Sequence, residues 1–187
     1  HEADEVIDSA MFAIFGLGML PAEDERVAKT MQAIENRLWC KTEVGGIARY
    51  ENDHYHQVSG DTENVPGNPW FICTLWLADY YIARAQTGDQ LREAAPLLEW
   101  VANRALPSGC LAEQVHPETN APLSVCPLTW SHATVVATLV KYLNKLSEMT
   151  ACPHCGQPHM CLLPESTIAD RPTMHANDVA PTPGTTE

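Results

Sequence analysis

The sequence predicts an all-α domain with helices arranged in two concentric rings, and two observations support this. Five helical segments can be placed, and they alternate between segments that are apolar on most faces and segments that are amphipathic. The connections alternate too, because the loops at 40–68 and 107–129 are long while the others are short. A helix that is apolar all round must be surrounded, so the pattern favours inner helices shielded by outer ones. An up-and-down bundle, in which every helix is amphipathic, ranks second.

The spacing of apolar residues gives the order of the five segments. Residues 5–19, 69–86 and 130–147 are predicted to be the inner helices, which are apolar on most faces. Residues 23–39 and 89–106 carry apolar side chains at helical spacing with charged side chains opposite, so they are predicted to be the outer helices. The inner helices therefore come first, third and fifth along the chain.

The predicted helix starts depend on residues that commonly cap helices. Asn68 is a plausible N-cap for the third segment, with Pro69 at the first helical position, and Asp89 is expected to cap the fourth. Both long loops end where an inner helix begins, at the positive end of the helix dipole. Irregular loops longer than roughly 15 residues are uncommon in compact domains unless they are functional. This end of the helices is therefore predicted to carry the active face.

Composition narrows the classes of function. The formal net charge is −13 with 11 Lys and Arg residues, which argues against a nucleic-acid partner. The longest apolar run, near 133–140, is shorter than the roughly 20 residues of a membrane span, so no membrane partner is expected. The 7 cysteines are irregularly spaced, which favours reduced, buried thiols over a disulfide framework. Reduced thiols in turn favour a cytoplasmic location.

Composition changes near residue 151, so the chain is divided into a helical domain at 1–150 and a tail at 151–187. The tail begins with a Cys-x-x-Cys turn that resembles one knuckle of a zinc ribbon. A structural zinc site there would use Cys152, Cys155, His159 and Cys161. The alternative is an unstructured Pro/Thr-rich tail with free thiols. The sequence leaves both readings open.

Four motifs follow one another between about residues 5 and 147. They read Gly46-Ile47-Ala48-Arg49-Tyr50 with Asp53 and Tyr55, Gly67-Asn68-Pro69-Trp70-Phe71-Ile72-Cys73-Thr74-Leu75-Trp76, Ala112-Glu113-Gln114, and Leu128-Thr129-Trp130-Ser131. Together they resemble glycoside hydrolase family 15, which comprises the glucoamylases, the glucodextranases and some bacterial trehalases. The family fold is an (α/α)6 barrel. The resemblance implies that this chain is the C-terminal portion of such a barrel and that the N-terminal half is missing.

The resemblance also implies an inverting hydrolase, in which an acid and a base lie about 6.5–9.5 Å apart with room for water between them. Glu113 stands at the family's general-base position. Arg49 and Asp53 match its substrate-gripping pair, and Trp70 and Trp130 match positions that line the sugar pocket. The alternatives are a solvated glutamate, a surface ion pair and core packing of the two indoles. Core packing is also the expectation for Tyr50 and Trp76, and structural roles are expected for His54, His56, His116 and His132.

The expected function is that of a fragment of an exo-acting enzyme that releases glucose from α-linked glucose oligo- or polysaccharides with inversion. Glu2 and Asp4 match no acid motif, so the fragment carries the base, lacks the acid and is expected to be inactive alone. No cofactor is required for this chemistry. The second hypothesis is a non-catalytic, glucan-sensing or regulatory domain, similar to the glucoamylase-like region of phosphorylase kinase regulatory subunits. The third is a truncated reading frame without activity.

Overall fold

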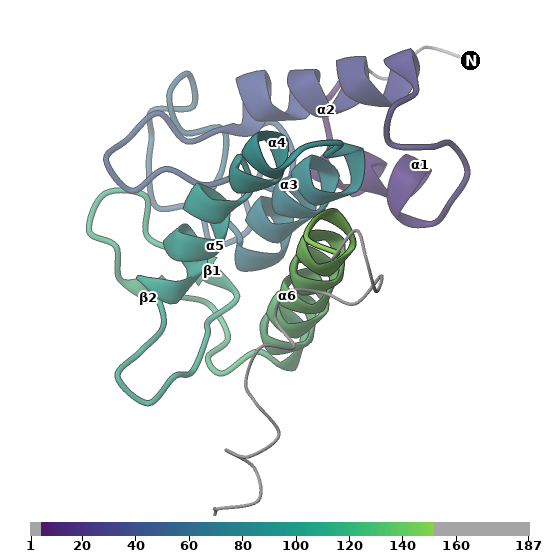
Figure 1. Cartoon of the computed structure of the whole chain (residues 1–187). Helices are drawn as coiled ribbons and strands as arrows, with labels where there is room; N and C mark the ends of the chain where they lie inside the picture. The colour runs from purple at the N-terminus through teal and green to yellow at the C-terminus, as the bar shows by residue number, and fades with distance from the viewer. Residues whose placement is uncertain (1–4, 152–187) are drawn as a thin grey trace, which may run out of the picture. The chain divides into compact units, whose positions relative to one another are not determined.

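The computed structural model describes residues 5–151, and the elements below belong to a compact unit that ends at Met149 (Figure 1). The unit is helical, with one short antiparallel strand pair. Among the described residues, no helix is long and apolar enough to cross a membrane. In chain order the elements are η1 (Ser9–Phe12), α1 (Ala13–Gly16), α2 (Glu25–Leu38), α3 (Phe71–Arg84), α4 (Gly88–Arg92), α5 (Ala95–Ala102), β1 (Gln114–Val115), β2 (Pro122–Leu123) and α6 (Thr129–Met149).

Helix α3 is the centre of the unit, as predicted for an inner helix. It packs against α1, α2, α4, α5, α6 and η1, and Figure 1 shows it between α2 and α6. Side chains on most faces of α3 are buried, and the buried residues include the polar Thr74 and Asp79. Because its side chains are apolar on nearly every face, only a surrounded position removes them from water. The prediction of an inner helix in this segment is confirmed.

Helix α2 is the outer, amphipathic helix that the spacing predicts. Its buried residues recur at helical intervals and are Val27, Met31, Ile34 and Leu38. The Asp24 side chain caps the helix by accepting a hydrogen bond from the Arg26 amide at 2.9 Å. The same carboxylate pairs with the Arg26 guanidinium, and these hydrogen bonds lower the pKa of Asp24 to about 2.

The first predicted helix is shorter than expected, because long-range pairing competes with it. Asp8 forms an antiparallel bridge with Tyr50, and the Ser9 amide donates to the Arg49 carbonyl at 2.8 Å. The chain is therefore extended until Asp8 caps the 3-10 turn η1, which leads into the four-residue α1. Local periodicity carries no information about these partners. The extended pairing nevertheless brings the N-terminal segment beside the first long loop.

The fourth predicted helix is divided into α4 and α5. Pro96 lies in the first turn of α5, where its missing N–H is tolerated, whereas the same residue inside one continuous helix would remove a hydrogen bond. The cap of α4 is Thr87, whose hydroxyl accepts from the Gln90 amide at 3.3 Å, so the prediction that Asp89 caps this segment is wrong.

The cap predicted at Asn68 is wrong as well. Pro69 and Trp70 form extended bridges with Ala48 and Gln114, so α3 begins only at Phe71, and Trp70 takes the N-cap position. The Asn68 side chain instead donates to the Gln114 Oε1 atom at 2.8 Å. These bridges join the two long loops at the start of α3.

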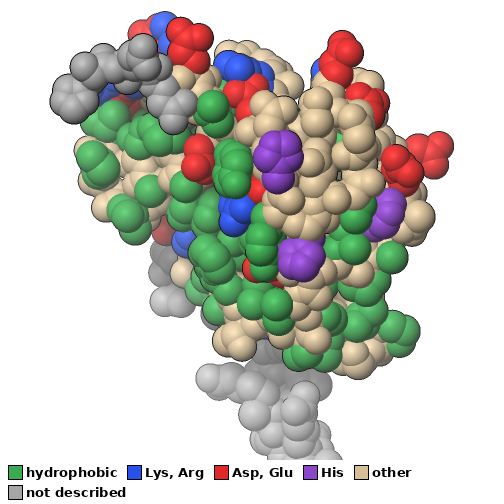
Figure 2. Space-filling view, turned by 180° about the vertical axis from the view of Figure 1, so that it is seen from behind, with side chains coloured by type: hydrophobic (Ala, Val, Ile, Leu, Met, Phe, Trp, Pro, Cys, Tyr) green, Lys and Arg blue, Asp and Glu red, His purple; other side chains and the backbone are tan. Residues whose placement is uncertain are grey.

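Helix α6 is less buried than α3. It forms one long helix, but among its described residues only Ser131 and Thr138 are buried. Its exposed apolar side chains include Val136, Leu139, Val140 and Leu143. The helix packs on α3, α4 and α5, and the rest of its apolar surface is exposed, as expected for an inner helix when the chain carries only a portion of the barrel. Hydrophobic side chains also gather over much of the face drawn in Figure 2.

Candidate active site

The two long loops and the start of α3 surround a cavity of ≈ 540 Å³. Four of the five predicted catalytic and sugar-binding residues line it. Its lining is Asp8, Ala10, Arg49, Tyr50, Tyr55, Trp70, Ile72, Cys73, Trp76, Glu113 and Trp130. A second cavity of ≈ 640 Å³, near Glu35, Trp39 and Leu97, contains none of the predicted site residues. The smaller cavity is therefore the candidate active site.

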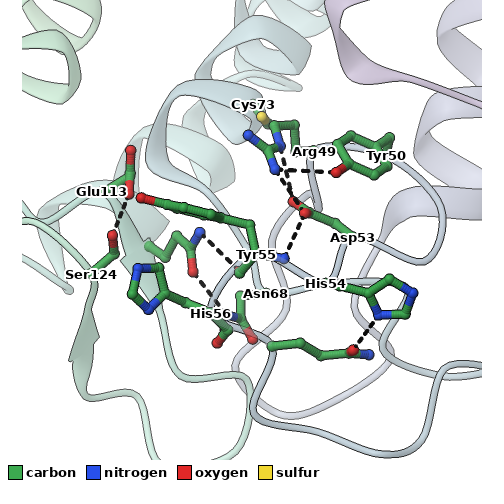
Figure 3. A network of polar contacts seen from close by, with 12 residues as sticks. Arg49, Tyr50, Asp53, His54, Tyr55, His56, Asn68, Cys73, Glu113 and Ser124 are labelled. Atoms are coloured by element: carbon green, nitrogen blue, oxygen red, sulfur yellow. Dashed lines mark hydrogen bonds and ion pairs between the residues drawn. The ribbon is translucent and has the colours of Figure 1, made fainter.

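Arg49 is held by Asp53 through two parallel hydrogen bonds. The Arg49 Nε and Nη2 atoms donate to Asp53 Oδ2 and Oδ1 at 3.0 and 2.8 Å (Figure 3). Burial alone would lower the pKa of Arg49, but the hydrogen bonds and charge of Asp53 outweigh that effect and raise it. Asp53 is fully buried, at 0% side-chain exposure, and is absent from the cavity lining. Of this pair, therefore, only Arg49 faces the cavity, with Asp53 enclosed behind it.

Three aromatic rings surround the Arg49 guanidinium. Its central carbon lies 4.8 Å from the Tyr50 ring centre, 5.2 Å from that of Tyr55 and 4.7 Å from that of Trp70. The Tyr50 hydroxyl also accepts a hydrogen bond from Arg49 Nη2 at 3.3 Å. These contacts limit the rotamers open to the long side chain, because cation–π attraction holds the guanidinium over the rings. Arg49 is thus preorganised at the cavity wall.

Glu113 lies on the opposite loop and also faces the cavity. The Ser124 hydroxyl donates to Glu113 Oε2, and Figure 3 shows the Tyr55 ring extending towards the Glu113 carboxylate. The backbone is fixed as well, because the Glu113 amide donates to the Val125 carbonyl at 2.9 Å and its carbonyl accepts from the Phe71 amide at 3.3 Å. The loop 124–125 and the start of α3 therefore both position the predicted base.

The remaining aromatic residues of the cavity differ in burial. Trp70 is 3% exposed, and within the described residues its Nε1 atom has no hydrogen-bond partner. Trp130, in the first turn of α6, is 53% exposed, with its ring centre 6.0 Å from that of Trp76. Trp76 is a core residue, as expected, but it lines the cavity together with Tyr50. Tyr50 is only partly buried and belongs to neither hydrophobic cluster among the described residues, so the expectation of core packing is wrong for Tyr50. Sequence reasoning missed that both residues line the cavity.

Sequence reasoning also missed Ser124 and Tyr55 as site residues. Tyr55 belongs to the first motif, so its place in that motif was an available signal, whereas Ser124 lies in no motif. The predicted zinc ligands Cys152, Cys155, His159 and Cys161 lie outside the described residues. Between residues 5 and 151, no group of three or more His, Cys, Asp or Glu side chains is placed to hold a metal ion.

Known proteins that are similar in sequence to this chain include a glycosyl hydrolase and a trehalase. The uncharacterized glycosyl hydrolase MJ1610 of Methanocaldococcus jannaschii is 34% identical over 140 residues, which cover 70% of this chain and 21% of that protein. The trehalase of Mycobacterium tuberculosis is 26% identical over 145 residues, covering 78% of this chain and 20% of that protein. The chain thus spans about a fifth of the length of these relatives.

Solved structures show the same fold. A bacterial glucoamylase complexed with acarbose aligns with a TM-score of 0.64 and 25% identity, covering 75% of this chain and 21% of that one. A structure described as a wild-type glycosidase aligns at 0.59 and 22% identity, covering 37% of that chain. The sequence profile of the family described as "Glycosyl hydrolases family 15" matches residues 1–140. The chain therefore belongs to glycosyl hydrolases family 15, and its helices form part of that family's (α/α)6 barrel.

Proposed function

We propose that this chain supplies the general base and part of the sugar pocket of an inverting, exo-acting α-glucoside hydrolase that releases glucose. The observation that carries the proposal is that Glu113 faces the same cavity as Arg49, Trp70 and Trp130. A carboxylate, a guanidinium and indole rings around one cavity suit a sugar, whose hydroxyls accept charged hydrogen bonds and whose apolar faces pack on aromatic rings. The reaction needs no cofactor.

In the proposed reaction Glu113 takes a proton from the attacking water. The Ser124 hydroxyl engages Oε2, which orients the carboxylate so that Oε1 can accept the proton. Water then adds to the anomeric carbon while an acid protonates the leaving glycosidic oxygen, so the configuration is inverted. Arg49 would bind sugar hydroxyls from the opposite wall, held in place by Asp53.

We assign the general acid to a part of the enzyme outside this chain. Asp8 is the second carboxylate that lines the cavity, but its Oδ1 atom accepts from the Ala10 amide at 2.8 Å and so caps η1. The acid should carry its proton at neutral pH and lie about 6.5–9.5 Å from Glu113. The chain covers 21% of the glucoamylase structure that it resembles, which leaves room for such a residue elsewhere. We also propose a cytoplasmic location, based on the free thiols of the described cysteines.

The test uses the longest natural protein that carries this chain. It is given maltooligosaccharides, isomaltooligosaccharides and trehalose, and the first anomer released is followed by proton NMR. We expect β-glucose first from the two oligosaccharide series and equal amounts of α- and β-glucose from trehalose. We expect Glu113→Gln to lower kcat by about 10³-fold with little effect on substrate binding. Glu118→Gln is the matched control, because it removes the same charge at an exposed position of the same loop.

Two results would contradict this assignment. Release of α-glucose first from the maltooligosaccharides or isomaltooligosaccharides, or of α-glucose alone from trehalose, would indicate retention and so exclude the inverting role of Glu113. Saturable binding of the sugars without hydrolysis would favour the non-catalytic, glucan-sensing hypothesis.

A further inference from the structure

The segment that precedes Glu113 is held by Leu128 and by the first turn of α6, which follows it. The Leu111 carbonyl accepts from the Leu128 amide at 2.9 Å, and the Leu111 amide donates to His132 Nε2 at 3.0 Å. The Ala112 carbonyl accepts from the Ser131 hydroxyl at 2.8 Å. Consecutive peptide groups before Glu113 are thus bonded to α6.

The bond to His132 specifies the state of its ring. A backbone amide can only donate, so Nε2 must be the unprotonated nitrogen and the proton of the neutral ring must lie on Nδ1. Leu111 is 4% exposed, so its amide has little access to water if His132 ceases to accept. Leaving a buried donor unpaired is costly, which makes His132 a specific partner for this position.

His132 is absent from the lining of the cavity. Any effect of this residue on the reaction therefore passes through the Leu111 backbone and not through contact with a ligand. A shift of the Leu111 backbone would readily reach Glu113, because Glu113 is only two residues further along the chain. The Glu113 amide is itself bonded to the Val125 carbonyl.

We propose that His132, as the neutral Nδ1–H tautomer, is a positioning residue that fixes the backbone before Glu113 and thereby the direction of its carboxylate. The proposal rests on the proposed function in that it takes Glu113 to be the base. Loss of the His132 bond would leave this segment with two of the three hydrogen bonds described above, while Glu113 itself stays bonded to Val125 and Phe71. A displacement of about 1 Å at a reacting group can cost about 10²-fold in rate.

The first test determines the tautomer in the 187-residue chain. Long-range proton–nitrogen NMR of the histidine rings at neutral pH is expected to show an unprotonated Nε2 and a protonated Nδ1 for His132. His116 is the internal standard for the opposite tautomer, because its Nδ1 atom accepts from the Glu118 and Thr119 amides at 3.2 and 3.3 Å. A protonated Nε2 at His132 overturns the proposal, and this result needs no variant.

The second test compares two variants by amide hydrogen exchange. His132→Gln keeps an oxygen acceptor near the Nε2 position, whereas His132→Leu removes the acceptor. We expect the Leu111 amide to exchange about tenfold faster in His132→Leu and at close to the wild-type rate in His132→Gln. Thr134→Val is the matched control, since it removes a hydrogen bond to the Trp130 carbonyl within the same helix. Unchanged Leu111 exchange in His132→Leu overturns the proposal.

The third test measures rates in the longer natural protein. We expect His132→Leu to lower kcat about 10²-fold while KM changes by less than about threefold, and His132→Gln to restore most of kcat. Protection of Leu111 in His132→Gln without recovery of kcat overturns the positioning role. If the wild-type protein hydrolyses no α-glucoside, the proposed function fails, whereas the tautomer and exchange results still decide whether His132 holds this segment.

Discussion

The Ser124 hydroxyl donates a hydrogen bond to Oε2 of Glu113 from a residue with a backbone φ of 62°. A positive φ is uncommon for a residue with a side chain, so the loop here adopts a conformation of limited stability. That conformation brings the Ser124 hydroxyl within hydrogen-bonding distance of the Glu113 carboxylate. The relationship gives the candidate base a fixed orientation that no sequence motif reveals.

Removing this hydroxyl is expected to slow the reaction without loss of the fold. We predict that Ser124→Ala lowers kcat about tenfold or more, because a hydrogen bond to a charged group is worth about 1.5–3 kcal/mol. Ser124→Gly is the matched control for backbone strain, since it also lacks the hydroxyl but accepts φ of 62° easily. Equal kcat in both variants would assign the loss to the hydroxyl, and wild-type kcat in either would contradict the prediction.

The sequence predicts the parts of the fold that local spacing determines. In α2, Val27, Met31, Ile34 and Leu38 recur at helical intervals, and in α3 nearly every face is apolar, so both helices and their inner or outer positions could be read directly. The length of the first helix could not, because the bridge from Asp8 to Tyr50 joins segments far apart in the chain. Local patterns do not encode such pairing.

Burial was the harder property to predict, both in the fold and in the site. An apolar composition shows that α6 should be covered but not which element covers it, and Val136 stays 60% exposed among the described residues. Asp53 shows the converse: the family motif indicated a residue that grips substrate, yet its carboxylate is enclosed behind Arg49. A motif can indicate that two residues contact each other, but it does not indicate which of the two faces the cavity.

The enclosed carboxylate of Asp53 predicts a loss of stability when its partner is removed. Arg49→Ala leaves a fully buried charge on Asp53, with the Tyr55 amide as its remaining hydrogen-bond donor among the described residues, at 3.0 Å. We expect the free energy of unfolding in urea to fall by about 2–3 kcal/mol, which is less than the roughly 3–5 kcal/mol for a fully buried pair because Arg49 is 33% exposed.

The double variant Arg49→Ala with Asp53→Asn is the control for that prediction. It removes the charge together with its partner, so it should lose less stability than Arg49→Ala alone. An equal loss in both would show that the buried charge is not the cause.

Two of the three tryptophans that line the cavity, Trp70 and Trp130, are predicted to separate effects on stability from effects on binding. Trp130 is 53% exposed, so Trp130→Ala should change the free energy of unfolding by less than about 1 kcal/mol and weaken sugar binding. Trp70 is 3% exposed, so Trp70→Ala should cost about 3–5 kcal/mol. Urea unfolding and titration with maltooligosaccharides measure the two effects. Unaltered sugar affinity in Trp130→Ala would remove that residue from the proposed pocket.

The buried thiols predict how stability changes at alkaline pH. Burial raises the pKa of the Cys40 thiol from 9.0 to about 12, and burial raises that of Cys73 to about 12 as well. Between pH 9 and 12 the unfolded chain loses these protons while the folded chain keeps them. Their contribution to stability is therefore complete below pH 9 and is lost as pH rises, by about 1 kcal/mol per pH unit for each thiol.

Cys40→Ser tests this window. Serine keeps a donor for the Gly67 carbonyl, which accepts from Cys40 Sγ at 3.2 Å, but it does not ionise below pH 12. Urea unfolding at pH 8, 9, 10 and 11 should therefore show a shallower fall in stability for the variant than for the wild type, and similar slopes below pH 9. Cys126→Ser is the matched control, because this thiol is exposed in the folded chain and its replacement should leave the alkaline slope unchanged. Parallel slopes for Cys40→Ser and the wild type would show that Cys40 ionises as readily in the folded chain as in the unfolded one.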